Sequence, residues 1–89
     1  NDHLAAGAFM QAFDQGIDIP GKVAMLGFGD FPISSQLGAG LSTVSVKRYD
    51  IGRKCAELLL AMQQALKAGQ KILPHHEVLQ PELVCRSST

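Results

Sequence analysis

The chain has 89 residues, of which 46% are hydrophobic and 18% are charged, and its 8 Lys and Arg balance its 8 Asp and Glu. This mixture is typical of a globular domain and argues against a disordered or membrane-embedded chain. Because the formal net charge is zero, composition gives no electrostatic reason for this stretch to bind nucleic acid. No apolar run approaches the roughly 20 residues needed to span a bilayer.

The order of the predicted elements indicates the carboxyl-terminal piece of a longer protein. The chain opens with Asn1 and Asp2 directly before a helix, with no Met and no preceding strand. A doubly wound α/β unit that starts at a helix has lost its first strand. For the same reason, the absence of a signal peptide carries little weight.

The first predicted helix runs from about His3 to Gln15. We expect the Asp2 carboxylate to cap its backbone N–H groups and Gly16 to end it in the left-handed conformation. Apolar residues recur at helical spacing and extend onto a second face: Leu4, Ala5, Ala8, Phe9, Ala12 and Phe13, then Ala6, Gly7 and Met10. A helix of this kind must be covered on two sides, either inside the fold or at a subunit interface.

The next predicted element is a strand from about Lys22 to Gly27. Its run of apolar residues predicts burial on both faces, in a parallel sheet covered by helices. Ligands usually bind beyond the carboxyl ends of such strands, so we expect the following loop to border a crevice.

Two alternatives stay open for each candidate side chain of that loop and for Asn1. Asp30 either orients a ligand hydroxyl or amine, or caps a short helical turn that has Pro32 in its first turn. Phe28 and Phe31 either stack on an apolar ring face or pack in the core. Asn1 offers a donor and an acceptor that suit a sugar hydroxyl, or it caps the first helix.

The second half of the chain is predicted to contain one long helix and several strands. Residues 41–46 alternate apolar and hydroxyl side chains and include β-branched residues, which predicts a strand. Residues 49–68 form an amphipathic helix that starts at Tyr49 or Asp50 and ends at Gly69. Two short strands are expected over 76–80 and 82–86, separated by Pro81.

No catalytic, metal or nucleotide site is predicted, and no cofactor. His75 and His76 are adjacent, so in an extended segment they point to opposite faces and do not readily chelate one metal ion. Gly27 and Gly29 form only half of a phosphate-binding loop. The serine pairs near residues 34 and 87 lack a nucleophile elbow.

Cys55 lies in the long helix and Cys85 in the last strand. Two such cysteines are predicted to be reduced core residues rather than a disulfide. A reduced pair favours the cytoplasm.

Five stretches occur in the order seen in the LacI/GalR family of bacterial repressors, which the chain resembles over nearly its whole length. They are Asn1-Asp-x-Leu-Ala-x-Gly-Ala, Val23-x-x-Leu-Gly-Phe-Gly-Asp, Leu41-Ser-Thr-Val-Ser-Val, Ile51-Gly-Arg-Lys-x-Ala-Glu-Leu-Leu-Leu and Pro81-Glu-Leu-Val-Cys-Arg-Ser-Ser-Thr89.

This resemblance implies an α/β fragment of a periplasmic-binding-protein-like (type I) core, with a parallel sheet and flanking helices. Residues 1–46 would belong to the carboxyl-terminal effector-binding subdomain. Residues 47–80 would cross over to the amino-terminal subdomain and pack their long helix on it. Residues 81–89 would form a strand that returns to the carboxyl-terminal subdomain. The crossings near 46–48 and 78–80 would be hinge strands.

The implied function is that of the effector-binding and dimerisation region of a DNA-binding transcriptional regulator. A homodimer would bind operator DNA through an upstream domain absent from this chain. Family ligand contacts carry over to Asn1, Asp2, Phe28, Gly29 and Asp30. The family's dimer interface carries over to Ala6, Met10 and Leu37.

The chain departs from the family where an acidic residue usually follows Gly-Phe or Gly-Tyr. Gly29 stands there instead, and Asp30 comes one place later. Loss of a negative charge at that position would suit an acidic effector, so a sugar or a sugar acid is expected.

Two other functions remain as alternatives. A periplasmic sugar-binding protein of a transporter has the same fold, although such proteins are usually monomers and this first helix is apolar on two faces. An enzyme on a Rossmann-like sheet would need a catalytic constellation, which this stretch lacks.

Overall fold

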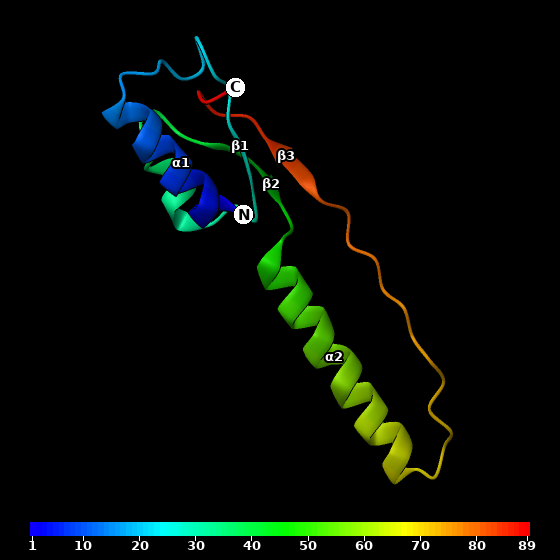
Figure 1. Ribbon diagram of the computed structural model, residues 1–89. Coiled ribbons are helices and arrows are strands. Elements are labelled where there is room, and N and C mark those ends of the chain that lie inside the picture. Colours follow the sequence, from blue (N-terminus) through cyan, green and yellow to red (C-terminus); the bar gives the residue numbers. More distant parts are fainter. The chain divides into compact units, whose positions relative to one another are not determined.

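The structure, a computed structural model, describes all residues from Asn1 to Thr89. Its elements are α1 (Asp2–Asp14), β1 (Leu26–Phe28), the 3-10 helix η1 (Pro32–Ser35), β2 (Ser42–Ser45), α2 (Arg48–Lys67) and β3 (Glu82–Val84) (Figure 1). The chain divides into two compact units: a first unit of residues 1–46 and 81–89, and a second unit of residues 47–80.

The first unit contains a three-stranded sheet in the order β1-β2-β3. β1 pairs with β2 in parallel, with Leu26 opposite Ser42, whereas β3 pairs with β2 antiparallel, with Val84 opposite Thr43. The predicted parallel sheet is therefore mixed. β2 leads into the second unit and β3 comes back from it, so two strands that lie side by side must run in opposite directions.

The prediction that β1 is buried on both faces is wrong. Gly27 is buried, but Leu26 and Phe28 are 56% and 53% exposed. Successive strand residues point to opposite faces, and α1 packs on only one of them (Figure 1). Residues 22–25, expected inside the strand, precede it.

The core of the first unit is small and mostly polar. Its buried apolar residues are Ala6, Ala12 and Leu41. Its buried polar residues are Asp2, Ser34, Ser42, Thr43 and Ser88. Every buried side-chain nitrogen or oxygen atom has a hydrogen-bond partner. Hydrogen bonds between segments therefore determine how these elements fit together.

The second unit consists of α2 and the segment that runs back along it, residues 68–80 (Figure 1). The predicted helix is confirmed, but it starts after Lys47, a left-handed residue with φ +49°, rather than at Tyr49 or Asp50. Gly69 ends it with φ +71°, as expected. The strand predicted over 76–80 is absent, because no neighbouring strand pairs with that segment.

Neither helix combines the length and the apolar character required to cross a bilayer. Cys55 and Cys85 are both free and exposed, so the expectation that they are core residues is wrong.

Candidate functional site

The amino terminus of α1 is joined to the loop after β1 by the side chain of Asp2. This fully buried carboxylate accepts hydrogen bonds from the backbone N–H of Phe31 at 2.8 Å, from Thr43 Oγ1 at 2.6 Å and from Ser34 Oγ. Its place in the first turn of α1 also suits a negative charge. One side chain therefore connects α1, β2 and the segment leading into η1.

The hydrogen bonds decide the charge of Asp2. Burial raises the pKa of this carboxyl, but the bonds from Ser34, Thr43 and the backbone N–H groups of Phe31 and Phe28 outweigh that effect, so the pKa lies below its ordinary value of 3.8. Asp2 is thus a carboxylate at neutral pH.

Asn1, not Asp2, caps α1, so the predicted role of Asp2 as the cap is wrong. Asn1 Oδ1 accepts a hydrogen bond from the backbone N–H of Leu4 at 3.1 Å. Asp2 cannot do so because its oxygen atoms point into the core. Asn1 itself is exposed.

The loop after β1 has a sharply defined backbone. Gly29 has φ +118°, and a Cβ atom there would lie 2.9 Å from Cε2 of Phe31, so no other residue fits without a shift. Its N–H donates to the carbonyl of Val44 at 2.8 Å. Asp30 follows with φ +53°, and its N–H donates to Thr43 Oγ1 at 3.3 Å.

Asp30 does not cap the turn at Pro32. The residue preceding η1 is Phe31, which makes no side-chain cap, while Pro32 stands in the first turn as predicted. The carboxylate of Asp30 accepts a hydrogen bond from Arg86 Nη2 at 2.9 Å. Arg86 belongs to the closing motif Pro81–Thr89, but its place in this site was not predicted from the sequence.

The two phenylalanines of the loop have different surroundings. The Phe31 ring lies 4.8 Å from the imidazole of His3, centroid to centroid, with the planes tilted by 37°. Phe28 is 53% exposed, so core packing does not describe it. It presents an apolar ring at the carboxyl end of β1.

The three residues expected at a dimer interface are placed differently. Ala6 is buried within the first unit and offers almost no surface to a partner. Met10 is 62% exposed and, together with Leu37, lines a surface groove that also includes Phe9 and Phe13.

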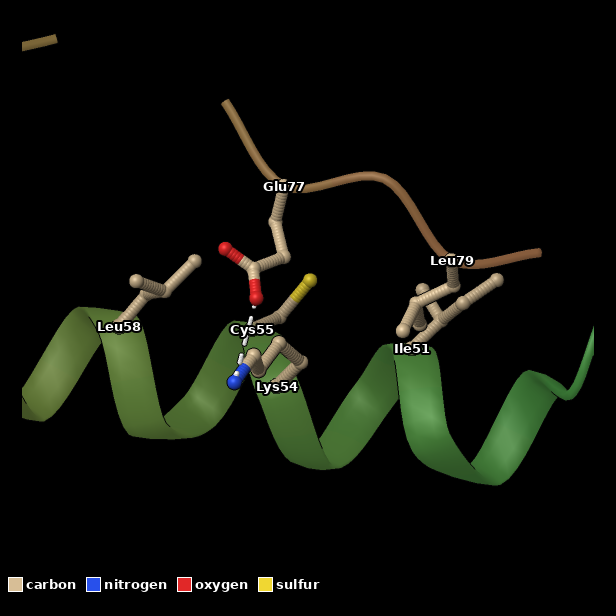
Figure 2. A pocket seen from close by; sticks show the side chains of 6 residues that line it. All are labelled: Ile51, Lys54, Cys55, Leu58, Glu77 and Leu79. Atoms are coloured by element: carbon tan, nitrogen blue, oxygen red, sulfur yellow. Dashed lines mark ion pairs between the residues drawn. The ribbon is translucent and has the colours of Figure 1, made fainter. Parts of the chain in front are cut away.

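The second unit has its own hollow, of about 230 Å³, between α2 and the returning segment, lined by Ile51, Lys54, Cys55, Leu58, Glu77 and Leu79 (Figure 2). Lys54 Nζ and Glu77 Oε1 form an ion pair at 3.2 Å across it. His75 Nε2 lies 2.8 Å from Glu77 Oε2. No three His, Cys, Asp or Glu side chains gather closely enough to hold a metal ion.

Comparison with known proteins gives matches over the whole chain. Residues 1–89 match the family described as "Periplasmic binding protein-like domain". The chain is 39% identical to the HTH-type transcriptional regulator GntR of Pseudomonas aeruginosa, with 100% of this chain and 25% of that protein covered. It is 37% identical to GalR (99% and 24% covered) and 33% identical to the repressor CytR (100% and 25% covered), both of Escherichia coli K12.

A solved structure has the same fold. A crystal structure of the Lac repressor bound to ONPG in the repressed state matches 100% of this chain and 26% of its own chain, with a TM-score of 0.85 and 24% identity. The chain thus spans about a quarter of the length of the proteins it matches.

Proposed function

This chain belongs to the periplasmic binding protein-like domain family, as part of a LacI/GalR-type regulator, and from that premise we propose that it contributes to the effector-binding and dimerisation region of a DNA-binding transcriptional regulator. Its relatives are named as transcriptional regulators and repressors, which favours this function over transport or enzymatic catalysis. We assign DNA binding to an upstream domain. We also propose that the protein acts in the cytoplasm.

In this proposal the first unit belongs to the carboxyl-terminal effector-binding subdomain. The second unit is the crossover, and its helix α2 packs on the amino-terminal subdomain. Residues 81–89 return to the carboxyl-terminal subdomain. Exposed apolar residues on α2, such as Leu59 and Leu66, support a role in packing against further protein.

The observation that carries the effector site is the anchoring of the loop after β1 by Asp2. Because Asp2 opens α1 and also binds the N–H of Phe31, it fixes Asn1 and residues 28–30 to the same end of the sheet. Ligands of open α/β folds bind at this end of the strands.

A sugar or sugar acid fits these groups. The exposed Asn1 amide is suited to hydroxyl groups, and the exposed ring of Phe28 is suited to the apolar face of a pyranose. Gly29 adds no charge, and Asp30 is paired with Arg86. A carboxylate on the ligand therefore meets no unbalanced acidic side chain from this loop.

The effector experiment measures binding of neutral sugars and their acids to the full-length protein by calorimetry. Asn1→Ser keeps a capping oxygen but removes the amide, and Phe28→Ala removes the ring. Each is expected to weaken the best ligand about tenfold or more, as loss of a specific contact does, while Gln11→Ala, an exposed change in α1, has no effect. Unchanged affinity in both variants would refute the site.

The regulatory part of the proposal is tested on operator DNA. The effector is expected to change operator affinity, because it favours one of two conformations that differ in DNA binding. A bound effector that leaves operator affinity unchanged would contradict it.

The dimer is proposed to form through the groove that contains Met10 and Leu37. The exposed Met10 and Phe13 give this surface its apolar character. Met10→Glu places a charge there and is expected to yield monomers in light scattering. Leu4→Glu is the control, because Leu4 is also an exposed apolar residue of α1 but does not line the groove. If the Met10→Glu variant remains a dimer, this groove is not the dimer interface.

A further inference from the structure

We propose that Arg86 is a positioning residue of this effector site: it fastens the loop after β1 and balances the charge of Asp30. The fastening is independent of any ligand, whereas the effect of the charge on ligand choice rests on the proposed function.

Arg86 is held on β2 by both its backbone and its side chain. Its N–H donates to Ser42 Oγ at 2.8 Å, and Ser42 Oγ donates to its carbonyl at 3.1 Å. The guanidinium donates from Nη1 to the carbonyl of Leu41 and from Nη2 to Asp30, each at 2.9 Å. A planar group with donors in several directions can bind both acceptors at once, which an ammonium does less well.

The absence of a side chain at Gly40 makes room for the side chain of Arg86. Gly40 has φ +111°, and a Cβ atom there would lie 2.8 Å from Cδ of Arg86. The aliphatic part of Arg86 therefore packs directly on the backbone just before β2. The side chain is only 23% exposed, which limits screening of its ion pair by water.

The contact matters because of the shape of the loop that it holds. Asp30 adopts the left-handed conformation, which is unfavourable for most residues with a side chain. It is held at its N–H by Thr43 and at its carboxylate by Arg86. Thr43 in turn donates to Asp2, so a series of contacts extends from the last residues of the chain to the start of α1.

The pair also sets the charge of the loop. With Arg86 in place, the carboxylate of Asp30 is balanced. Removing the guanidinium takes a positive charge from beside this carboxylate, so the electrostatic potential of the loop becomes more negative and disfavours an anionic ligand. At the effective dielectric constant of a protein surface, this repulsion amounts to about a tenfold loss in affinity.

The experiment uses the full-length protein with Arg86→Gln, Asp30→Asn and the double variant. Calorimetry gives the ratio of affinities for a sugar acid and its neutral sugar. Hydrogen exchange gives the opening of residues 29–31. Arg53→Gln is the control, because this arginine lies on α2 in the second unit and pairs with Glu57 at the surface.

We expect Arg86→Gln to lower the acid-to-neutral ratio about tenfold and the double variant to restore it, since Asn carries no charge. A ratio that stays low in the double variant would show that Arg86 binds the anion itself and would overturn charge balancing. If Arg86→Gln does not fold, the test rests on Asp30→Asn alone. The proposal then requires this variant to raise the acid-to-neutral affinity ratio, because it removes a negative charge from the loop, and an unchanged ratio would overturn charge balancing.

We also expect the amides of residues 29–31 to exchange faster in Arg86→Gln and in Asp30→Asn, with those of α2 unchanged. Wild-type exchange in both variants would refute the fastening role. If the wild-type protein binds neither the acids nor the sugars, the proposed effector class fails, and the exchange result alone decides the role of Arg86.

Discussion

Gly27 lies directly beneath the carboxylate of Asp2: a Cβ atom added to Gly27 would stand 2.1 Å from Asp2 Oδ1. The one buried residue of β1 is therefore the one that lacks a side chain. This close approach allows a charged group from α1 to reach the loop beyond β1 and to accept hydrogen bonds from Phe31, Ser34 and Thr43.

Gly27→Ala is expected to destabilise the first unit by about 1–3 kcal/mol, the usual cost of overpacking a well-packed site. The new methyl group would also stand 3.0 Å from Cδ2 of Leu41, so both neighbours must move. Gly7→Ala is the matched control: its Cβ meets nothing within 4 Å, and alanine should stabilise α1 by about 1 kcal/mol. Urea unfolding of the full-length protein measures both changes in the free energy of unfolding. Equal changes in the two variants would contradict the close approach of Gly27 to Asp2.

Asp2→Asn is expected to cost about 1–3 kcal/mol at neutral pH, because donors that faced a carboxylate lose an acceptor in a buried site. The pKa of Asp2 is lowered in the folded state, so its ionised form stabilises the fold above pH 3.8. That contribution is lost as the pH falls from 3.8 through the lower folded-state pKa. The stability difference between wild type and variant should therefore shrink in acid, and a difference independent of pH would show that Asp2 is not ionised.

The closing residues of the chain are held by Ser88, a serine for which the sequence predicted no role. Ser88 is 1% exposed; its Oγ accepts from the N–H of Ser42 and donates to the carbonyl of Met25, each at 2.7 Å. Its backbone pairs with Met25 and Gly40. Ser88→Ala is expected to cost about 1–3 kcal/mol, since two buried groups lose a partner.

Ser35→Ala is the control for Ser88→Ala, because the Ser35 hydroxyl donates to the carbonyl of Pro32 in an exposed position. It should change the free energy of unfolding by less than about 0.5 kcal/mol. A similar effect of the two substitutions in urea unfolding would refute the bridging role of Ser88.

The sequence was sufficient where a local pattern determines the structure. The helical spacing of apolar residues predicted α2, and alternation predicted β2. Gly16 adopts the left-handed conformation expected of it, and Gly69 follows the end of α2 as predicted. Order and identity of short motifs predicted the family, which the comparison over residues 1–89 confirms.

The sequence was insufficient where distant segments meet. Asp2 next to a helix suggested a cap, and only the placement of Thr43 and Ser34 shows why its carboxylate turns inward. Asp30 and Arg86 are 56 residues apart, so their ion pair leaves no periodic signal. The apolar run before Gly27 indicated burial on two faces, but whether a second layer covers a strand depends on elements outside the pattern.

Glu77 gives a test within the second unit. Its pKa is lowered from 4.5, chiefly by the hydrogen bond with His75 and next by Lys54. His75→Ala is therefore expected to bring the pKa of Glu77 back toward 4.5, as followed by NMR of isotope-labelled glutamate in the full-length protein. His76→Ala is the control, because the adjacent residue of an extended segment points the other way. An unchanged Glu77 pKa in His75→Ala would mean that the 2.8 Å contact between the two side chains does not persist in solution.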